Sequence, residues 1–343
     1  MSATAIGLLL LSAIVSFLYS WKQHTEAITK FHNITFLSTN VEDGQPVAIP
    51  DQSPAVVLTK AVFHALSTSN QLVAHVDIIY RTIAMKIRHF SVPSHAQNWQ
   101  NWLTKGKINV VFSPYINQTK WGWVQKEETS EQELDYTMRV LDDLVNIAFN
   151  EEFTDATYHV SQAHFKFCFA VTVLRESIHL LTKYAFPYQI TPVVPGTILH
   201  SGEAGYGFEH AVFEGKLVCE WDEGKVSELK HLQRLLVRKH FDGVEHDFEL
   251  SDEEIHQFLD KLCNTSSNTT FSLDTAGHEP SVTPLGRIRT ANEAERQRAA
   301  AGILKKPVGL SLTAPAPGTE RTGTMLGDVC YDRRPWSRKH AGL

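Results

Sequence analysis

The sequence contains few of the residue patterns that build redox, nucleotide or metal sites. It has four cysteines (Cys168, Cys219, Cys263 and Cys330), and no two of them have the C-x-x-C spacing of a zinc ribbon or redox motif. It also lacks a Walker A sequence, a G-x-G-x-x-G turn, a G-x-S-x-G elbow, an H-E-x-x-H sequence and an EF-hand loop. These absences disfavour nucleotide-dependent and α/β-hydrolase chemistry. In an oxidising compartment we expect one disulfide, Cys219–Cys263, although a pair of buried free thiols fits the sequence equally well.

Basic residues are missing from the N-terminus, where the first one is Lys22. Residues 5–19 are apolar apart from two serines, which is close to the minimum length of a membrane span. A cleaved signal peptide would have a basic start and small residues before its cleavage site, and neither is present. We therefore expect residues 1–21 to form an uncleaved signal-anchor or transmembrane helix. A cleaved signal, giving a secreted protein, and a buried N-terminal helix are the alternatives.

Charge is unevenly distributed along the 343 residues, whose net charge is -6. From Leu273 onward there are 11 basic and 7 acidic residues, which leaves 21 basic and 31 acidic residues before it. The acidic body argues against nucleic acid as a partner. The stretch 264–343 is rich in Thr, Pro, Gly and Arg without periodicity, so we expect a disordered basic tail.

Four N-glycosylation sequons favour a luminal or extracellular body, in the endoplasmic reticulum or at the cell surface. They begin at Asn33, Asn117, Asn264 and Asn268. Lys22, which directly follows the apolar stretch, favours the opposite orientation under the positive-inside rule. A single lysine is a weak signal, so the sequons decide the expected orientation.

The periodicity of apolar residues predicts a helix-dominated α+β domain over residues 22–263, with a small antiparallel β portion. The predicted strands are 108–112, 120–124 paired with it, and a hairpin of 208–214 with 217–221. The predicted helices are 55–67, 70–90, 94–106, 134–148, 161–186, the basic amphipathic stretch 226–241, and 251–262. The last of these starts with Ser251 and Glu254 at capping-box spacing.

The longest predicted helix, 161–186, carries a stripe of polar residues beside its apolar face. The stripe consists of His164, Cys168, Thr172, Glu176 and His179, which recur every three or four residues. Such a stripe either faces solvent or lines the wall of a pocket. Cys168 and Thr172 are unusual for a solvated face, and imidazoles near a carboxylate are typical of acid–base sites. We therefore take His164, Glu176 and His179 as candidate catalytic residues.

A divalent metal is a second possibility, with His200, Glu203 and His210 as candidate ligands and Glu209 beside them in a Gly-rich stretch. A His–Glu pair there could also act as a general base and its orienting group. A solvent-exposed loop is the alternative without function. Two Glu-x-x-His sequences, Glu176–His179 and Glu253–His256, also have the spacing found in di-iron bundles.

Together these features suggest a membrane-anchored secretory-pathway enzyme that acts on a small apolar molecule. It would use His/Glu acid–base or metal-assisted chemistry, with the reaction type (isomerisation, cyclisation, lyase or hydrolase chemistry) and the oligomeric state left open. The alternative is a non-catalytic anchored glycoprotein that binds a partner.

Overall fold

The protein has an α+β fold in a computed structural model. The structure describes residues 30–39, 46–86, 92–114, 121–126, 136–154, 157–187, 204–222, 228–241, 244–273, 275 and 278–280. Within these ranges there are seven α-helices and two sheets. No helix in the described ranges is long and apolar enough to cross a membrane. The predicted anchor, 1–21, and the tail beyond residue 280 lie outside the described residues.

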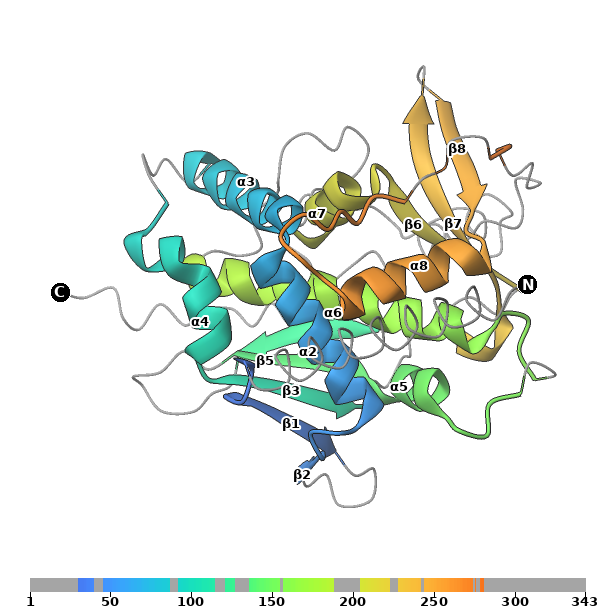
Figure 1. The fold of residues 1–343 in the computed structure, drawn as a ribbon, viewed down its shortest axis with the longest axis horizontal. Helices are drawn as coiled ribbons and strands as arrows, with labels where there is room; N and C mark the ends of the chain where they lie inside the picture. Colours follow the sequence, from blue (N-terminus) through green and yellow to red (C-terminus); the bar gives the residue numbers. More distant parts are fainter. Residues whose placement is uncertain are drawn as a thin grey trace, which may run out of the picture.

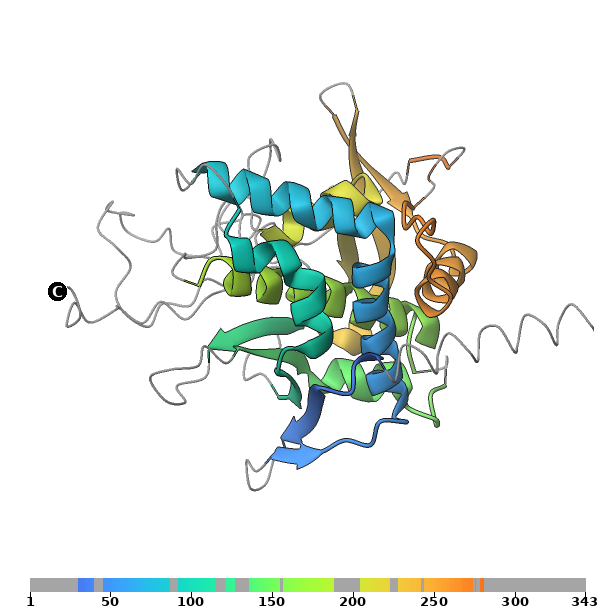
Figure 2. The same cartoon turned by 60° about the vertical axis from the view of Figure 1, so that its left-hand side comes forward.

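Helix α6 (Gln162–Ala185) runs through the middle of the molecule, and 19 of its 24 residues are buried. It is about 36 Å long at 1.5 Å per residue. The larger sheet lies on one side of it, while α2, α7 and α8 lie against its other sides (Figures 1 and 2). A helix covered in this way cannot present a continuous polar face to solvent, so most polar residues of its central turns are part of the interior.

The larger sheet has the strand order β2-β1-β3-β5-β4. Strands β1, β3 and β5 are parallel, and β2 and β4 are antiparallel strands at the two edges. This sheet is therefore mixed, and the predicted antiparallel arrangement holds only for the second sheet. The strand prediction at 108–112 is confirmed, but β4 pairs with β5 and not with β3. The bounds are Ile34–Thr39 (β1), Pro46–Ala48 (β2), Ile108–Ser113 (β3), Gly122–Lys126 (β4) and Tyr136–Leu141 (β5).

Most of the predicted helices are confirmed. Helices α2 (Pro54–Thr68) and α3 (Asn70–Lys86) follow the predicted apolar periodicity, and α4 (Trp99–Lys105) continues a 3-10 turn. Helix α8 (Asp252–Cys263) begins with the predicted capping box: the Ser251 side chain accepts from Glu254 N, and the Glu254 side chain accepts from Ser251 N. Leu250 and Ile255, which flank this start, are both buried, as a hydrophobic staple requires.

Three predicted elements are wrong. The predicted helix 134–148 is strand β5 followed by the short helix α5 (Asp142–Phe149), because β5 occupies a place in the sheet between β3 and β4. The predicted strand 208–214 belongs to helix α7 (Ala204–Phe213). Much of the predicted basic helix 226–241 is strand β7 (Leu232–Phe241).

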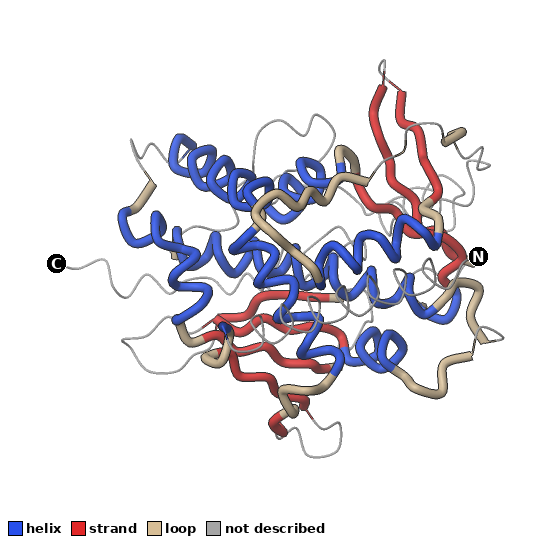
Figure 3. The backbone as a smooth tube through the Cα atoms, in the orientation of Figure 1, coloured by secondary structure: helices blue, strands red, loops and turns tan. Residues whose placement is uncertain are grey.

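Strand β7 is the centre of the second sheet, between β6 (Lys216–Trp221) and β8 (Val244–Glu249) (Figure 3). Its arginines face acids on both neighbouring strands. The Arg234 guanidinium lies 2.5 Å from Glu220 Oε2 and 2.8 Å from Glu249 Oε2. Arg238 Nε donates to Asp247 Oδ1 at 2.7 Å. These cross-strand pairs account for the basic pattern that resembled a helix face.

The cysteines and sequons in the described part do not all fit the expectations. Cys168, Cys219 and Cys263 are free thiols, so the expected Cys219–Cys263 disulfide is not formed. Asn264 and Asn268 are exposed after the end of α8. Asn33 is half-buried, and its Nδ2 donates a hydrogen bond to the Gly106 carbonyl. Asn117 lies outside the described residues.

The start of α8 can be tested by removing its capping hydroxyl. Ser251→Ala should lower the free energy of unfolding by about 1 kcal/mol, because the Glu254 N–H loses its acceptor. Ser53→Ala is a matched control, since Ser53 is the N-cap of α2 and makes no side-chain cap hydrogen bond. Urea unfolding of both variants measures the difference. Equal losses would show that the capping box does not stabilise α8.

Candidate acid–base site on helix α6

The polar stripe of α6 is buried. Relative exposures are 3% for Thr172, 2% for Glu176 and 0% for His179, and Arg175 beside the stripe is 5% exposed. Charged side chains are rarely buried to this extent unless other groups compensate them. The interpretation of the stripe as a solvated helix face is therefore excluded.

Two glycines bring neighbouring elements into close contact with this stripe. A Cβ atom on Gly122, at the start of β4, would lie 2.6 Å from Glu176 Cγ and 2.7 Å from Thr172 Cγ2. A Cβ atom on Gly205, in the first turn of α7, would lie 2.7 Å from both Arg175 Cγ and His179 Nε2. Thr172 and Glu176 therefore face β4, whereas Arg175 and His179 face α7. Each pair is separated by four residues and so shares one side of the helix.

Helix α7 adds a second buried carboxyl group, that of Glu209. Its Oε1 accepts a hydrogen bond of 2.7 Å from the Leu217 backbone N–H. Burial raises the pKa of Glu209 to about 7, against the opposing effects of the Arg175 charge and the Leu217 N–H. Glu209 lies on a helix and not on the predicted strand, and it is buried while His210 next to it is exposed.

The pKa of His179 is shifted downward, which keeps its imidazole uncharged. Burial holds the pKa of His179 well below its ordinary value, and the positive charges of Arg175 and Lys183 lower it further. At neutral pH the site therefore contains a neutral imidazole and a carboxyl group that titrates near pH 7. Pairs of groups whose environments set their pKa values in this way can exchange protons with a bound molecule.

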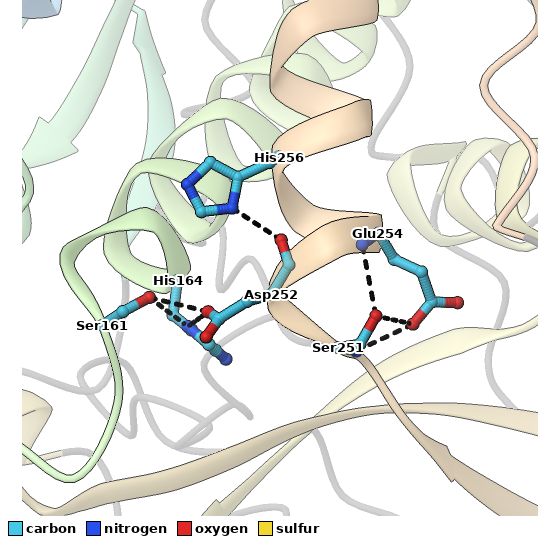
Figure 4. A network of polar contacts seen from close by, with 6 residues as sticks. All are labelled: Ser161, His164, Ser251, Asp252, Glu254 and His256. Carbon is cyan, nitrogen blue, oxygen red and sulfur yellow. Dashed lines mark hydrogen bonds and ion pairs between the residues drawn. The ribbon is translucent and has the colours of Figure 1, made fainter. Parts of the chain in front are cut away.

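His164 does not belong to this cluster. It lies 12 residues before Glu176 on the same helix, which is about 18 Å along the axis. Its Nδ1 lies 2.9 Å from Ser161 Oγ and 3.4 Å from Asp252 Oδ1, and Ser161 Oγ donates to Asp252 Oδ1 at 2.9 Å (Figure 4). The predicted grouping of His164 with Glu176 and His179 is therefore not formed.

The residues around His164 include the three side-chain types of a serine-hydrolase triad, in a different arrangement. Ser161 and Asp252 both contact Nδ1, whereas a triad places serine at one ring nitrogen and the acid at the other (Figure 4). His256 lies nearby but bonds the Asp252 backbone carbonyl, at 2.6 Å. We interpret this network as a link between the start of α6 and the start of α8.

The predicted metal ligands do not come together in the described part of the chain. His210 is exposed, and His200 and Glu203 lie outside the described residues. Among the residues that are described, no group of three His, Cys, Asp or Glu side chains could hold a metal ion. Glu253 and His256 are exposed on α8 whereas Glu176 and His179 are buried, so the two Glu-x-x-His sequences do not face one di-iron site.

Cys168 extends the cluster toward the second sheet. Its thiol lies close enough to that of Cys219, on β6, to affect the pKa of Cys219. Burial raises the pKa of the Cys219 thiol well above its usual range, with further contributions from Cys168 and the Glu209 carboxyl. The Cys219 thiol is therefore protonated at neutral pH, and both cysteines are buried, unlike the exposed thiolate of a catalytic cysteine.

Arg175 is the residue of this site that the sequence reasoning missed. The sequence signal for it is its position four residues before His179, which places both on one side of the helix. Glu209 was considered only with the histidines of its Gly-rich stretch, as part of a metal cluster or of a His–Glu acid–base pair. Its actual partner, the Leu217 N–H, depends on the α7–β6 connection and has no sequence signature.

The raised pKa of Glu209 can be tested by measuring how the free energy of unfolding depends on pH. Because its pKa is raised when folded, the native state binds the proton more tightly than the unfolded state, and stability falls as pH rises from about 4.5 to 7. Relative to Glu209→Gln, the free energy of unfolding of the wild type should fall by on the order of 3 kcal/mol over that pH range and stay constant above it. Urea unfolding at a series of pH values measures this, with Glu253→Gln, at an exposed position, as control. A pH-independent difference would contradict the shift.

Comparison with known proteins identifies no relative of this chain. No protein-family model matches it. No curated protein and no solved structure matches it either. The function is therefore argued from the residues of the site itself.

Proposed function

We propose that the chain is a secretory-pathway enzyme, anchored by residues 1–21, that performs acid–base chemistry on a small molecule at the α6–α7 cluster. The observation that carries the proposal is the presence of two buried groups with shifted pKa values near Arg175: Glu209, which titrates near neutrality, and His179, which is neutral. Perturbed groups of this kind are concentrated at functional sites.

Each residue has a role that follows from its position. Glu209 donates or accepts the proton, because its pKa is about 7. His179 serves as the neutral hydrogen-bonding partner, and Arg175 stabilises negative charge on the reacting molecule. Glu176, beside β4, is a second carboxylate available to position the substrate.

Two neutral polar atoms near the cluster also support binding of a small molecule. Thr172 Oγ1 and Trp121 Nε1 are buried with no hydrogen-bond partner among the described residues. The Thr172 side chain packs against Gly122, and Trp121 precedes Gly122 in the sequence. A polar atom of a bound molecule or a water would satisfy them. The core around them is mostly apolar, including Trp221, whose ring packs edge-on against Trp121. The substrate expected from this composition is largely apolar with one ionisable group.

The proposal predicts that activity depends on the cluster and not on the other histidines. Purified full-length protein would be incubated with a small-molecule extract of its source cells, and compounds consumed or formed would be identified by mass spectrometry. Conversion by the wild type should fall about 100-fold or more in Glu209→Gln and in a Glu176→Gln, His179→Gln double variant. His256→Gln, on the surface of α8, should keep full activity. Equal conversion in the double variant and the wild type would refute the assignment.

The secretory placement makes a separate prediction about the sequons. If the body is luminal, Asn264→Gln and Asn268→Gln should each remove one glycan, because both asparagines are exposed. Asn33→Gln should leave the glycosylation unchanged, since the half-buried Asn33 amide donates to the Gly106 carbonyl. Gel mobility with and without an endoglycosidase, on membranes extracted with alkaline carbonate, measures both glycosylation and anchoring. A chain whose mobility does not respond to the glycosidase would place the body outside the lumen.

The close approach of Gly122 and Gly205 to α6 favours one alternative, a non-catalytic glycoprotein whose buried cluster only holds the elements together. In that case Glu209→Gln and the double variant would change stability, and the extract would be unaltered by the wild type as well.

A further inference from the structure

Helix α3 leaves one side uncovered. In the described part of the chain three large apolar side chains are exposed: Val47 (56%), Ile78 (55%) and Met85 (69%). Ile78 and Met85 lie seven residues apart on α3, which is two turns, so they share one side of the helix. Ala74 and Arg81, which are also exposed, lie on the same side. We call Ala74, Ile78, Arg81 and Met85 the outer side of α3.

The other sides of α3 are covered. They contact α2, α6 and α7, and α3 lies at the edge of the molecule in both views (Figures 1 and 2). The one acid of the helix, Asp77, accepts a hydrogen bond of 3.2 Å from Trp99 Nε1 on α4. The His75 ring meets the Phe208 ring of α7 edge-on, with centroids 6.3 Å apart. The outer side therefore presents two large apolar side chains and one positive charge.

This composition fits a lipid surface. In helices that lie on a membrane, apolar side chains enter the boundary between headgroups and acyl chains, while arginine stays at the level of the phosphates. A second copy of the chain is the other candidate. A stable dimer buries about 800 Å² on each partner, and two apolar side chains on one helix supply a small part of that area. The outer side of α3 therefore fits a bilayer better than a second copy.

The chain that leads to the proposed anchor starts beside α3. Lys30, the first described residue, donates a hydrogen bond of 3.1 Å from Nζ to Ser67 Oγ. Ser67 lies in the last turn of α2, three residues before α3 begins at Asn70. Residues 22–29 separate Lys30 from the anchor at 1–21, and an extended chain of that length spans at most about 30 Å. A bilayer that holds the anchor is therefore within reach of α3, and this tether makes even a weak contact with the lipid well populated.

We propose that the outer side of α3 lies on the surface of the membrane into which residues 1–21 are inserted. Ile78 and Met85 enter the boundary between headgroups and acyl chains, and the Arg81 guanidinium binds lipid phosphates. The inference rests on the anchor of the proposed function and is independent of the acid–base cluster.

The test is photo-crosslinking from defined positions of the full-length chain. p-Benzoylphenylalanine would replace Ile78, Met85 or Val47, and the chain would be irradiated in the isolated membranes of the producing cells. Mass spectrometry of the labelled chain should show phospholipid adducts at positions 78 and 85. Val47 is the matched control, because it is as exposed as Ile78 but lies on β2, on the opposite side of the molecule, and should form none (Figures 1 and 2).

The charge and the apolar contact can be tested separately with the probe at position 85. Arg81→Glu should lower the yield of lipid adduct, whereas Arg81→Lys keeps the charge and should retain the yield. Ile78→Asp should lower it about tenfold, because the carboxylate cannot enter the apolar boundary that the isoleucine occupies. A yield that neither Arg81→Glu nor Ile78→Asp changes overturns the proposal.

Alkaline carbonate extraction distinguishes a failure of this inference from a failure of the anchor. A chain that resists carbonate but forms no lipid adduct at 78 or 85 overturns the docking of α3 and leaves the anchor in place. A chain that carbonate releases, with adducts at both positions formed before extraction, overturns the anchor and supports the docking. A released chain without adducts overturns both. Adducts to a second copy or to the chain itself, or equal lipid adducts at position 47, also overturn the docking.

Discussion

The structure depends on one constraint, which is that a helix covered on all sides carries an arginine, a glutamate and a histidine within two turns. Arg175, Glu176 and His179 on α6 are each at most 5% exposed. Removing such groups from water is costly, so neighbouring elements have to approach closely and supply compensating charge and hydrogen bonds. The glycines at the starts of β4 and α7 allow this approach, because a Cβ atom at either position would overlap an α6 side chain.

The same burial produces the chemistry of the cluster. A low-dielectric environment disfavours charge on any group, so it raises the pKa of the Glu209 carboxyl and lowers that of the His179 imidazole. Arg175 remains charged and moderates the shift at Glu209 while increasing the one at His179. The permanent charge of Arg175 thus lowers the pKa of both neighbouring groups. This is why we give Arg175 a role in the proposed reaction.

Other polar groups of the protein are compensated nearer to the surface. The second sheet neutralises its basic strand with acids on both sides, as in the Glu220–Arg234–Glu249 set. The start of α6 is joined to the start of α8 through Ser161, His164 and Asp252, whose carboxylate is largely exposed. These contacts fix the elements around α6 and leave its central turns as the site where ionisable groups are enclosed together.

The sequence by itself determined the helices with long apolar periodicity, the strand predicted at 108–112, and the capping box of α8, because these signals arise within one segment. It also identified Glu176 and His179, but grouped them with the distant His164. Only the tertiary structure decided that 136–141 and 232–241 are strands, since a short amphipathic segment fits either period until a sheet provides its partners. Only the tertiary structure brought Glu209 within reach of the Arg175 charge, because this depends on how α7 packs against α6, and packing between elements has no local sequence signature.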